Sequence, residues 1–181
     1  MKKESRKICN KGYTLVEIIV AIAILAAVTG LLVPNASQLF SYHARECNSK
    51  INVSISQLKV ETLAKSKEVG DIFMKIEIPN TGANKGKIVK TVKHADGTTD
   101  TEVIGAKKLK LSYKDASGTH NVTAGSGSIT ITFDRATGGM VNVSGPISGV
   151  HTISNATISE ITVTGGKTYH TSIFPGTGKT R

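Results

Sequence analysis

The apolar positions of this chain follow three successive patterns. From Thr14 to Val33 the sequence is apolar apart from two threonines, one glycine and a single charge, Glu17. From Asn35 to about Lys67 apolar residues recur every three or four positions, which predicts an amphipathic helix. Beyond Gly70 they alternate with polar residues, which predicts short strands. The patterns predict an α+β fold, in which a long N-terminal helix packs on a C-terminal antiparallel β-sheet.

The first apolar run has the length of a membrane-spanning helix. Its 20 residues, at about 1.5 Å per residue, match a hydrocarbon core about 30 Å thick. A carboxylate such as Glu17 costs about 2.5–3.5 kcal/mol there and usually marks a function with a partner charge. The run itself holds no cation. The nearest candidate partner is the amino group that cleavage after Gly12 creates, and we expect it to come from another subunit.

Two simpler interpretations fit this run less well. A secretory signal peptide has an apolar region of about 7–15 residues and a small-residue cleavage site. Here the run is longer, and only Ala21-Ile22-Ala23 resembles such a site. A plain membrane anchor accounts for the length but gives no reason for Glu17. A soluble secreted adhesin would require cleavage near Ala23 or beyond, which N-terminal sequencing detects.

The second pattern predicts that the helix continues with one face on the sheet. Pro34 removes its N–H bond to Gly30, so we expect a kink or a loosened turn there. Counted from Tyr13, the helix would have about 55 residues and a length of about 80 Å, which is typical of a filament core or a coiled coil. The predicted buried stripe consists of Leu39, Phe40, Ala44, Cys47, Ile51, Ile55, Leu58 and Thr62 or Leu63.

Turn residues divide the C-terminal part into strands. Pro79-Asn80 ends the first of them, and Asp96-Gly97 is a hairpin signal. The predicted strands cover residues 72–78, 87–93, 99–104, 109–113, 128–133, 140–143, one or two segments within 153–163, and 168–174.

The N-terminal sequence resembles a known signal. The run KGYTLVEIIVAIAILAAVTGLLVP is similar to the class III signal and N-terminal helix of type IV pilins and pseudopilins. The matching positions are Gly12 before the scissile bond, Tyr13 as the first mature residue, Glu17 at mature position five and Pro34 at position 22. The family usually has phenylalanine where this chain has Tyr13. The resemblance implies cleavage after Gly12, N-methylation of Tyr13, and assembly through Glu17, with Gly30 and Pro34 as a hinge.

This resemblance also implies a function and partners. We expect a structural subunit of a type IV pilus-like filament, either a pilin or a minor pilin or pseudopilin, and not an enzyme. Its partners would be other pilin subunits, a prepilin peptidase, an inner-membrane platform protein and an assembly ATPase. It would be a single-pass membrane protein before assembly and part of a cell-surface filament afterwards. The expected segments are a leader at 1–12, an assembly helix at 13–34, an amphipathic helix at 35–68 and a β-rich head at 69–181.

Basic residues in the head suggest a second possible function. The C-terminal third is similar to pseudopilin H and FimT-like minor pilins, some of which bind DNA through a C-terminal Gly-Arg-x-Arg motif. The corresponding segment here ends in Lys179 and Arg181. Period two also places Lys108 and Lys110 on one strand face, where lysines bind phosphate or protect an edge from aggregation. The alternatives are therefore a DNA-binding minor pilin of a DNA-uptake pilus, or a pseudopilin of a type II secretion-like system.

Composition adds limits on chemistry. The net charge is +10, and part of it lies in the basic leader, which favours a cytoplasmic position for that end. Of the two cysteines, Cys9 leaves with the leader, so Cys47 is expected to be a helix-packing residue without a disulfide partner. The five histidines lack metal-ligand spacing, and the segment GTGKT lacks the first glycine of a phosphate-binding loop. We predict no catalytic residue, metal or cofactor.

Overall fold

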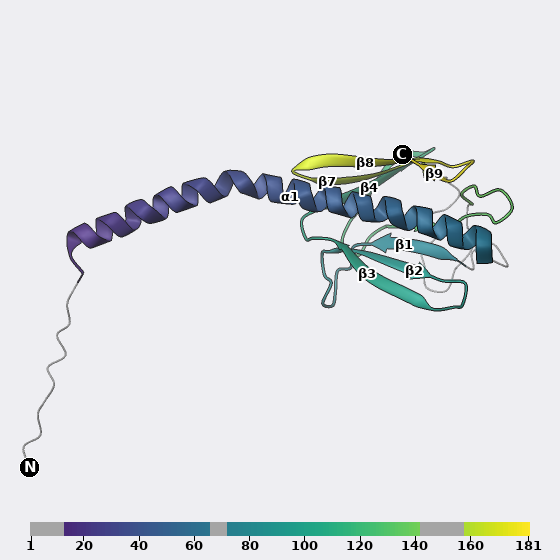
Figure 1. Cartoon of the computed structure of the whole chain (residues 1–181), viewed down its shortest axis with the longest axis horizontal. Coiled ribbons are helices and arrows are strands. Elements are labelled where there is room, and N and C mark those ends of the chain that lie inside the picture. The colour runs from purple at the N-terminus through teal and green to yellow at the C-terminus, as the bar shows by residue number, and fades with distance from the viewer. Residues whose placement is uncertain (1–12, 66–71, 142–157) are drawn as a thin grey trace, which may run out of the picture. The chain divides into compact units, whose positions relative to one another are not determined.

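One long helix and two antiparallel sheets make up the described part of the chain (Figure 1). The computed structural model describes residues 13–65, 72–141 and 158–181, and within these the side chains of residues 31–36 are excepted. Helix α1 runs from Leu15 to Lys65. The chain divides into two compact units, residues 1–36 and 37–181, and α1 contributes to both. The predicted α+β fold is confirmed.

Two sheets are present in the described residues, where the sequence predicted one. The first has the order β3-β2-β1-β6 and the second the order β5-β4-β7-β8-β9, and all the neighbours pair antiparallel. The strands are β1 (Phe73–Glu77), β2 (Ile88–Lys93), β3 (Thr99–Gly105), β4 (Lys110–Asp115), β5 (Gly118–Val122), β6 (Ser128–Ile131), β7 (Glu160–Gly165), β8 (Lys167–Phe174) and β9 (Lys179–Thr180).

The second half of α1 buries one stripe of side chains. Its spacing of three and four residues keeps the stripe on one side of the helix. The buried residues are Ala44, Cys47, Ile51, Ile55, Leu58 and Thr62, none more than 2% exposed. The prediction was wrong for Leu39, which is 56% exposed, and Thr62 rather than Leu63 completes the stripe. Burial raises the pKa of the Cys47 thiol to about 12, so this residue packs as a small apolar group.

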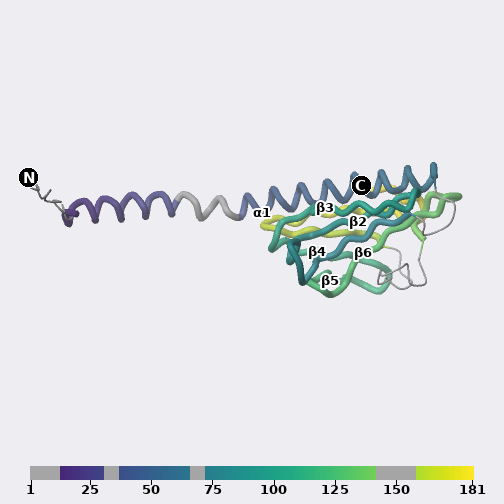
Figure 2. Tube along the Cα trace, turned by 90° about the horizontal axis from the view of Figure 1, so that it is seen from below, coloured from purple at the N-terminus to yellow at the C-terminus, as the bar shows by residue number. Residues whose placement is uncertain are grey.

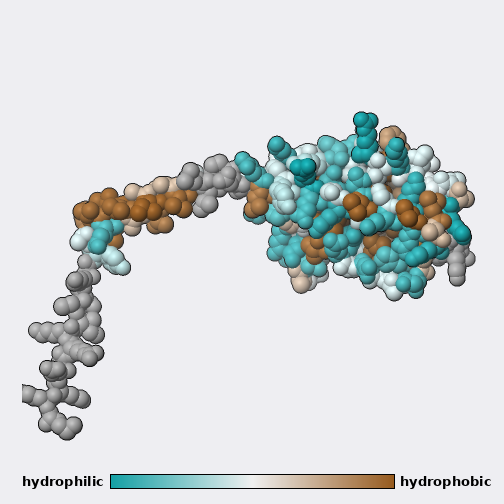
Figure 3. Space-filling view, in the orientation of Figure 1, coloured by the Kyte–Doolittle hydropathy of each residue, from teal (hydrophilic) through white to brown (hydrophobic). Residues whose placement is uncertain are grey.

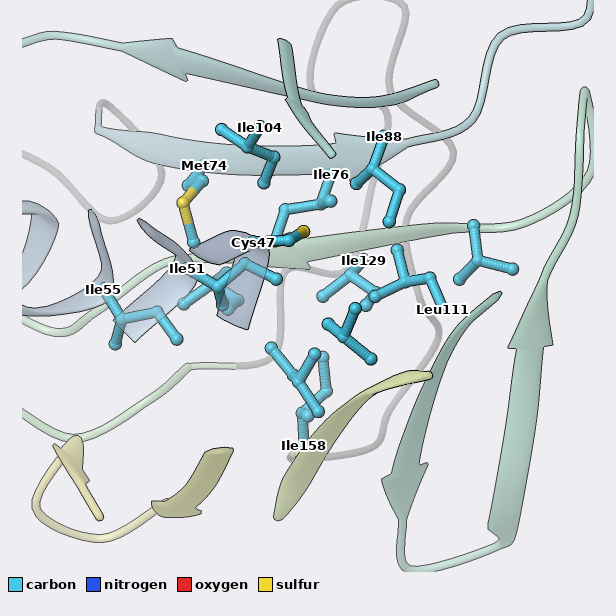
Figure 4. Packing of buried hydrophobic residues seen from close by; sticks show 14 of the residues in the cluster. Cys47, Ile51, Ile55, Met74, Ile76, Ile88, Ile104, Leu111, Ile129 and Ile158 are labelled. Atoms are coloured by element: carbon cyan, nitrogen blue, oxygen red, sulfur yellow. The ribbon is translucent and has the colours of Figure 1, made fainter. Parts of the chain in front are cut away.

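Strands of both sheets run alongside the second half of α1 (Figure 2). Side chains of both sheets contribute to the hydrophobic core against this stripe (Figure 4). On the side of the first sheet, a Cβ at Gly105 would lie 3.0 Å from the Cys47 sulfur. On the side of the second sheet, the turn after β7 comes so close that a Cβ at Gly166 would meet the Ser37 carbonyl oxygen at 2.4 Å. Gly166 also has a φ of +77°, which favours glycine. The second half of α1 therefore packs closely against both sheets.

Polar side chains of α1 fasten the last strands. The Asn48 side-chain oxygen accepts a hydrogen bond from the Thr171 hydroxyl at 3.0 Å, and its nitrogen donates to the His170 carbonyl at 3.4 Å. One turn further on, Asn52 accepts a hydrogen bond from the Thr180 hydroxyl. These contacts fix which face of the second sheet points toward α1.

Two strands were missed by the sequence analysis. In β5 only Val122 is buried, so its apolar alternation is too weak to be recognised. In β9 the two residues Lys179 and Thr180 are polar, and their pairing with β8 depends on the tertiary structure. The predicted hairpin after β6 is present as a bridge between Phe133 and Met140. The predicted strand residues 142–143 and 153–157 lie outside the described part of the chain.

Candidate functional site

The start of α1 is closed by a reciprocal pair of hydrogen bonds between Thr14 and Glu17. The Glu17 N–H donates to the Thr14 hydroxyl oxygen at 3.2 Å. In return, Glu17 Oε2 accepts the Thr14 N–H at 2.8 Å and the Thr14 hydroxyl at 3.0 Å. This is a capping box, which satisfies backbone donors that the first helical turn leaves open. The sequence analysis missed it, although the spacing Thr-x-x-Glu before an apolar run is its signature.

This pair gives Glu17 a partner within its own chain. Among the described residues Glu17 forms no ion pair. Tyr13, next to the capping threonine, is 83% exposed. Gly12 and the predicted scissile bond lie outside the described residues, so the predicted pairing of Glu17 with a neighbouring subunit's amine stays a prediction.

An apolar sleeve follows the cap. We use this term for the apolar side chains of residues 15–28, which are exposed on every side of the helix. Figure 3 shows one face of this apolar stretch. The exposed fractions of its large apolar side chains range from 47% at Ile18 to 76% at Leu15. A helix that is apolar all round requires an apolar environment, because no polar face is left to meet water. Within this segment the chain itself supplies no such cover.

The sleeve leads into the predicted hinge. Helix α1 continues through both Gly30 and Pro34. A Cβ at Gly30 would have no neighbour within 4 Å, so no contact in the described structure requires glycine there. The hinge stays a prediction. In the described part of the chain, no helix combines the length and the apolarity that crossing a membrane needs.

The structure brings three of the four predicted phosphate contacts to one face. Lys110 lies on β4 and Lys179 on β9, and the Arg181 backbone exchanges two hydrogen bonds with Ser172 of β8. Ile173, which follows Ser172 on β8, is buried on the opposite face. It pairs with Thr180, whose hydroxyl donates a hydrogen bond to Asn52 of α1. Lys110, Lys179 and Arg181 therefore point away from α1, since neighbours in register share a face and alternate residues lie on opposite faces.

Lys108 corrects the sequence prediction. It does not share a strand face with Lys110, because it precedes β4 in a left-handed turn with a φ of +73°. Its ammonium group lies 5.9 Å from the centre of the Phe40 ring, a cation–π contact on the α1 side. Periodicity misplaced it because the strand begins two residues later.

The described histidines of the head, His94, His120 and His170, bond to carboxylates rather than to one another. His94 lies between Glu61, at 2.8 Å from Nδ1, and Asp100, at 3.2 Å from Nε2. His120 and Ser117 both reach the same oxygen of Asp115, and Ser117 meets the ring nitrogen that faces this oxygen. A catalytic triad needs the acid and the serine on opposite ring nitrogens. Among the described residues, no three or more histidine, cysteine or acidic side chains are placed so that they could hold a metal ion.

Comparison with known proteins gives one match, and it covers the N-terminal segment. Residues 8–33 match the family model of the prokaryotic N-terminal methylation motif. No curated protein and no solved structure matches the chain significantly. The similarity of the C-terminal third to minor pilins stays a prediction, because the match ends at residue 33. The matched segment includes the capping box and the whole apolar sleeve, and the chain therefore carries the class III signal of type IV pilins and pseudopilins.

Proposed function

We propose that this protein is a structural subunit of a type IV pilus-like filament, assembled through the first half of α1. The precursor would be cleaved after Gly12 by a prepilin peptidase and methylated at the Tyr13 amine. The methylation motif at residues 8–33 supports this processing. Assembly would then require an inner-membrane platform protein and an ATPase, and the subunit would move from the membrane to the cell surface.

The observation that carries this proposal is the apolar sleeve. Its side chains are about half or more exposed around the whole helix. A patch of this kind marks an interaction site or a membrane contact. Lipid would cover it before assembly, and the equivalent helices of neighbouring subunits would cover it in the filament. A helix contacted by neighbours on all sides is the arrangement of a fibre core, which explains why no side of the sleeve is polar.

Glu17 would have two successive roles in this process. In the single chain its Oε2 completes the capping box with Thr14. In the filament its negative charge would pair with the Tyr13 amine of the next subunit. Mispairing in an apolar surrounding would leave a buried charge, so the ion pair would select the axial register more than it would add net stability.

Mass spectrometry of protein from native cells tests the processing step. We expect a mature chain that begins at Tyr13 and carries a methyl group on its N-terminal amine. Residues 1–12 still attached in the assembled material would contradict the proposal. The genes that lie beside this one would distinguish a pilus from a secretion or competence machine.

Substitutions at Glu17 separate its two roles. Glu17→Gln keeps a side-chain oxygen that accepts the Thr14 N–H but removes the charge, whereas Glu17→Ala removes both. If pairing with an amine matters, both variants lose filament assembly, measured by shearing and sedimentation of surface fibres. Thr14→Ser is the matched control, because it retains the capping hydroxyl, and it should assemble normally. Assembly of Glu17→Gln at the wild-type level would limit Glu17 to the capping role.

A further inference from the structure

Strand β3 is the outermost strand of the first sheet, and one of its edges has no strand partner in the described residues. The sheet order places only β2 beside it. The residues from Thr99 to Val103 are all exposed. This stretch contains neither proline nor lysine, which natural edge strands use against unwanted pairing. An edge of this kind is a template on which a further strand can add.

The backbone groups of Thr101 point toward this open edge. The His94 N–H donates to the Thr98 carbonyl at 2.9 Å, so these two residues form a hydrogen-bonded pair between β2 and β3. Such pairs alternate along antiparallel strands, and the next ones on β3 are Asp100 and Glu102. Thr101, which lies between them, therefore directs its N–H and C=O away from β2. These groups are free to bond to an added strand.

A hollow of about 350 Å³ lies on the α1 side of β3. Gln57 of α1 and Asp100 of β3 line it, and the buried side chains of Leu58 and Val92 add apolar surface. In an added strand every second side chain would point to this side of the sheet. A long side chain with an aliphatic stem and a charged head suits a hollow with apolar and ionised walls.

The carboxylates at the hollow are unevenly neutralised. Glu102 has an ion pair with Lys90 at 2.9 Å. Asp100 has only His94 as an ion-pair partner in the described part of the chain, at 3.2 Å, and its side chain is 79% exposed. Glu61 shares the same histidine, at 2.8 Å. One imidazole carries at most one positive charge, so a net negative charge remains beside Asp100 and attracts a cation.

The same acids disfavour a second copy of this chain at the edge. If two copies paired antiparallel with Thr101 opposite Thr101, Asp100 of each copy would lie opposite Glu102 of the other. Like charges directly opposite each other destabilise a strand pair, whereas opposite charges stabilise it. The edge therefore favours a strand that carries cations at alternate positions.

We propose that the open edge of β3 binds an extended peptide segment of a partner protein, antiparallel to β3, with a lysine or arginine opposite Asp100 that reaches into the hollow. Main-chain hydrogen bonds to residues such as Thr101 supply the affinity in this mode of recognition, and alternate side chains supply the specificity. This goes beyond filament assembly, because it concerns the head and requires no neighbouring subunit.

The test measures the fluorescence anisotropy of a labelled peptide, Thr-Lys-Thr-Lys-Thr-Lys-Thr, added to the full chain in a non-ionic detergent. With lysines opposite Asp100 and Glu102, the peptide's threonine amides would face β3 and its lysine amides would face away. Methylation of the threonine amides should therefore abolish binding, whereas methylation of the lysine amides should preserve it. The two methylated peptides have the same composition and charge. A peptide with glutamate in place of lysine should bind more weakly than either.

Two pairs of variants locate the site on the protein. Thr101→Pro removes the outward N–H, which an edge strand tolerates, and should weaken binding about tenfold with an unchanged urea midpoint. Its control, Thr101→Ala, keeps the N–H and should bind like the wild type. Asp100→Asn should weaken the lysine peptide by up to about fivefold. Its control, Asp134→Asn, changes an acid outside the hairpin of β2 and β3 and should have no effect. Should Thr101→Pro unfold, the methylated peptides still decide.

Three results would overturn the proposal. The first is equal binding of the two methylated peptides, because association would then follow charge alone. The second is equal binding of the lysine peptide to Asp100→Asn and to the wild type. The third is self-association of the wild type in analytical ultracentrifugation that Thr101→Pro abolishes, without peptide binding, which would assign the edge to a second copy. The assay needs neither cleavage nor fibres, so its failure would leave the assembly proposal intact.

Discussion

The two halves of α1 differ both in how many apolar residues they carry and in what surrounds those residues. In the first half, isoleucines such as Ile22 are 60% exposed, whereas in the second half Ile51 is fully buried between two sheets. The first half shows its apolar residues on all sides, and the second concentrates them in one stripe with charges on the other faces. The number of apolar residues and their periodicity together decide what covers each half of the helix.

This contrast separates stability from assembly. The second half of α1 belongs to the compact unit 37–181, whose core includes side chains of both sheets. None of the described side chains of residues 13–30 belongs to that core. Changes in the second half should therefore unfold the head, and changes in the first half should affect only what binds to the sleeve.

The largest effect should come from a matched pair of substitutions, Ile51→Ala and Ile22→Ala. At Ile51 the smaller side chain leaves a cavity in the core and should lower the free energy of unfolding by about 2–5 kcal/mol. At Ile22 the same change should stay within about 0.5 kcal/mol of wild type. Urea unfolding of both proteins in the same detergent measures the difference. A loss at Ile22 as large as the loss at Ile51 would contradict the separation of the two halves.

A smaller effect should follow from the polar contacts of the two halves. Asn48→Ala removes the acceptor of the buried Thr171 hydroxyl, and an unsatisfied buried group costs about 1–3 kcal/mol. The Thr29 hydroxyl in the first half donates to the Leu25 and Ala26 carbonyls of its own helix, so Thr29→Ala should be nearly neutral. The same unfolding assay compares them. Combining Asn48→Ala with Thr171→Val should recover part of the loss, because the orphaned hydroxyl is then gone.

Much of this fold could be predicted from the sequence because local periodicity carried the information. The stripe from Ala44 to Leu58 and the strands flanking Asp96-Gly97 follow helical and alternating patterns that hold without knowledge of the tertiary structure. The division into two sheets could not be predicted, since it depends on β6 pairing with β1 and β7 pairing with β4. Partners so distant in sequence leave no local signal.

The candidate sites were predictable to different extents. The spacing from Gly12 to Glu17 indicated the methylation motif, because this motif is a continuous stretch of sequence that requires no knowledge of the fold. The face of the second sheet that points away from α1 was only partly predictable. Lys114 joins Lys110 there through the alternation of β4, and Lys179 is placed by the pairing of β9 with β8, in which it lies opposite Phe174. Lys108 was misplaced by a turn, which alternation alone does not reveal.

A modest, pH-dependent effect on the free energy of unfolding should come from His94, which bonds to Glu61 of α1 and to Asp100 of β3. The hydrogen bond to Glu61 raises the pKa of His94, and Asp100 on the other ring nitrogen acts in the same direction. The nearby Asp96 is a further acid. Both ring nitrogens face carboxylates, so the protonated imidazole satisfies both. The stabilisation is complete below the ordinary pKa of about 6.5 and is lost as the pH rises through the raised value.

The free energy of unfolding, measured between pH 5.5 and 8.5, checks whether stability falls as the pH rises. Above pH 6.5 the free energy of unfolding of the wild type should fall by a few tenths to about 1 kcal/mol, a small amount because the site is partly solvated. The His94→Asn variant should not show this fall. Glu61→Gln should reduce the fall as well. A variant with a changed residue in the first half, such as Ile22→Ala, should titrate like the wild type. Stability that increases through this pH range would reverse the assignment.

The smallest effect on stability should come from Thr14→Val, which removes the capping hydroxyl at the start of α1. Loss of a helix cap costs about 0.5–2 kcal/mol, but here it acts on the first turn and not on the core of the head. We expect faster amide hydrogen exchange at Glu17 and Ile18, with an unchanged urea midpoint. Thr14→Ser should restore the protection, because a serine hydroxyl can occupy the same position. A shifted urea midpoint would mean that the cap and the head unfold together, which would remove the distinction between the two halves of the helix.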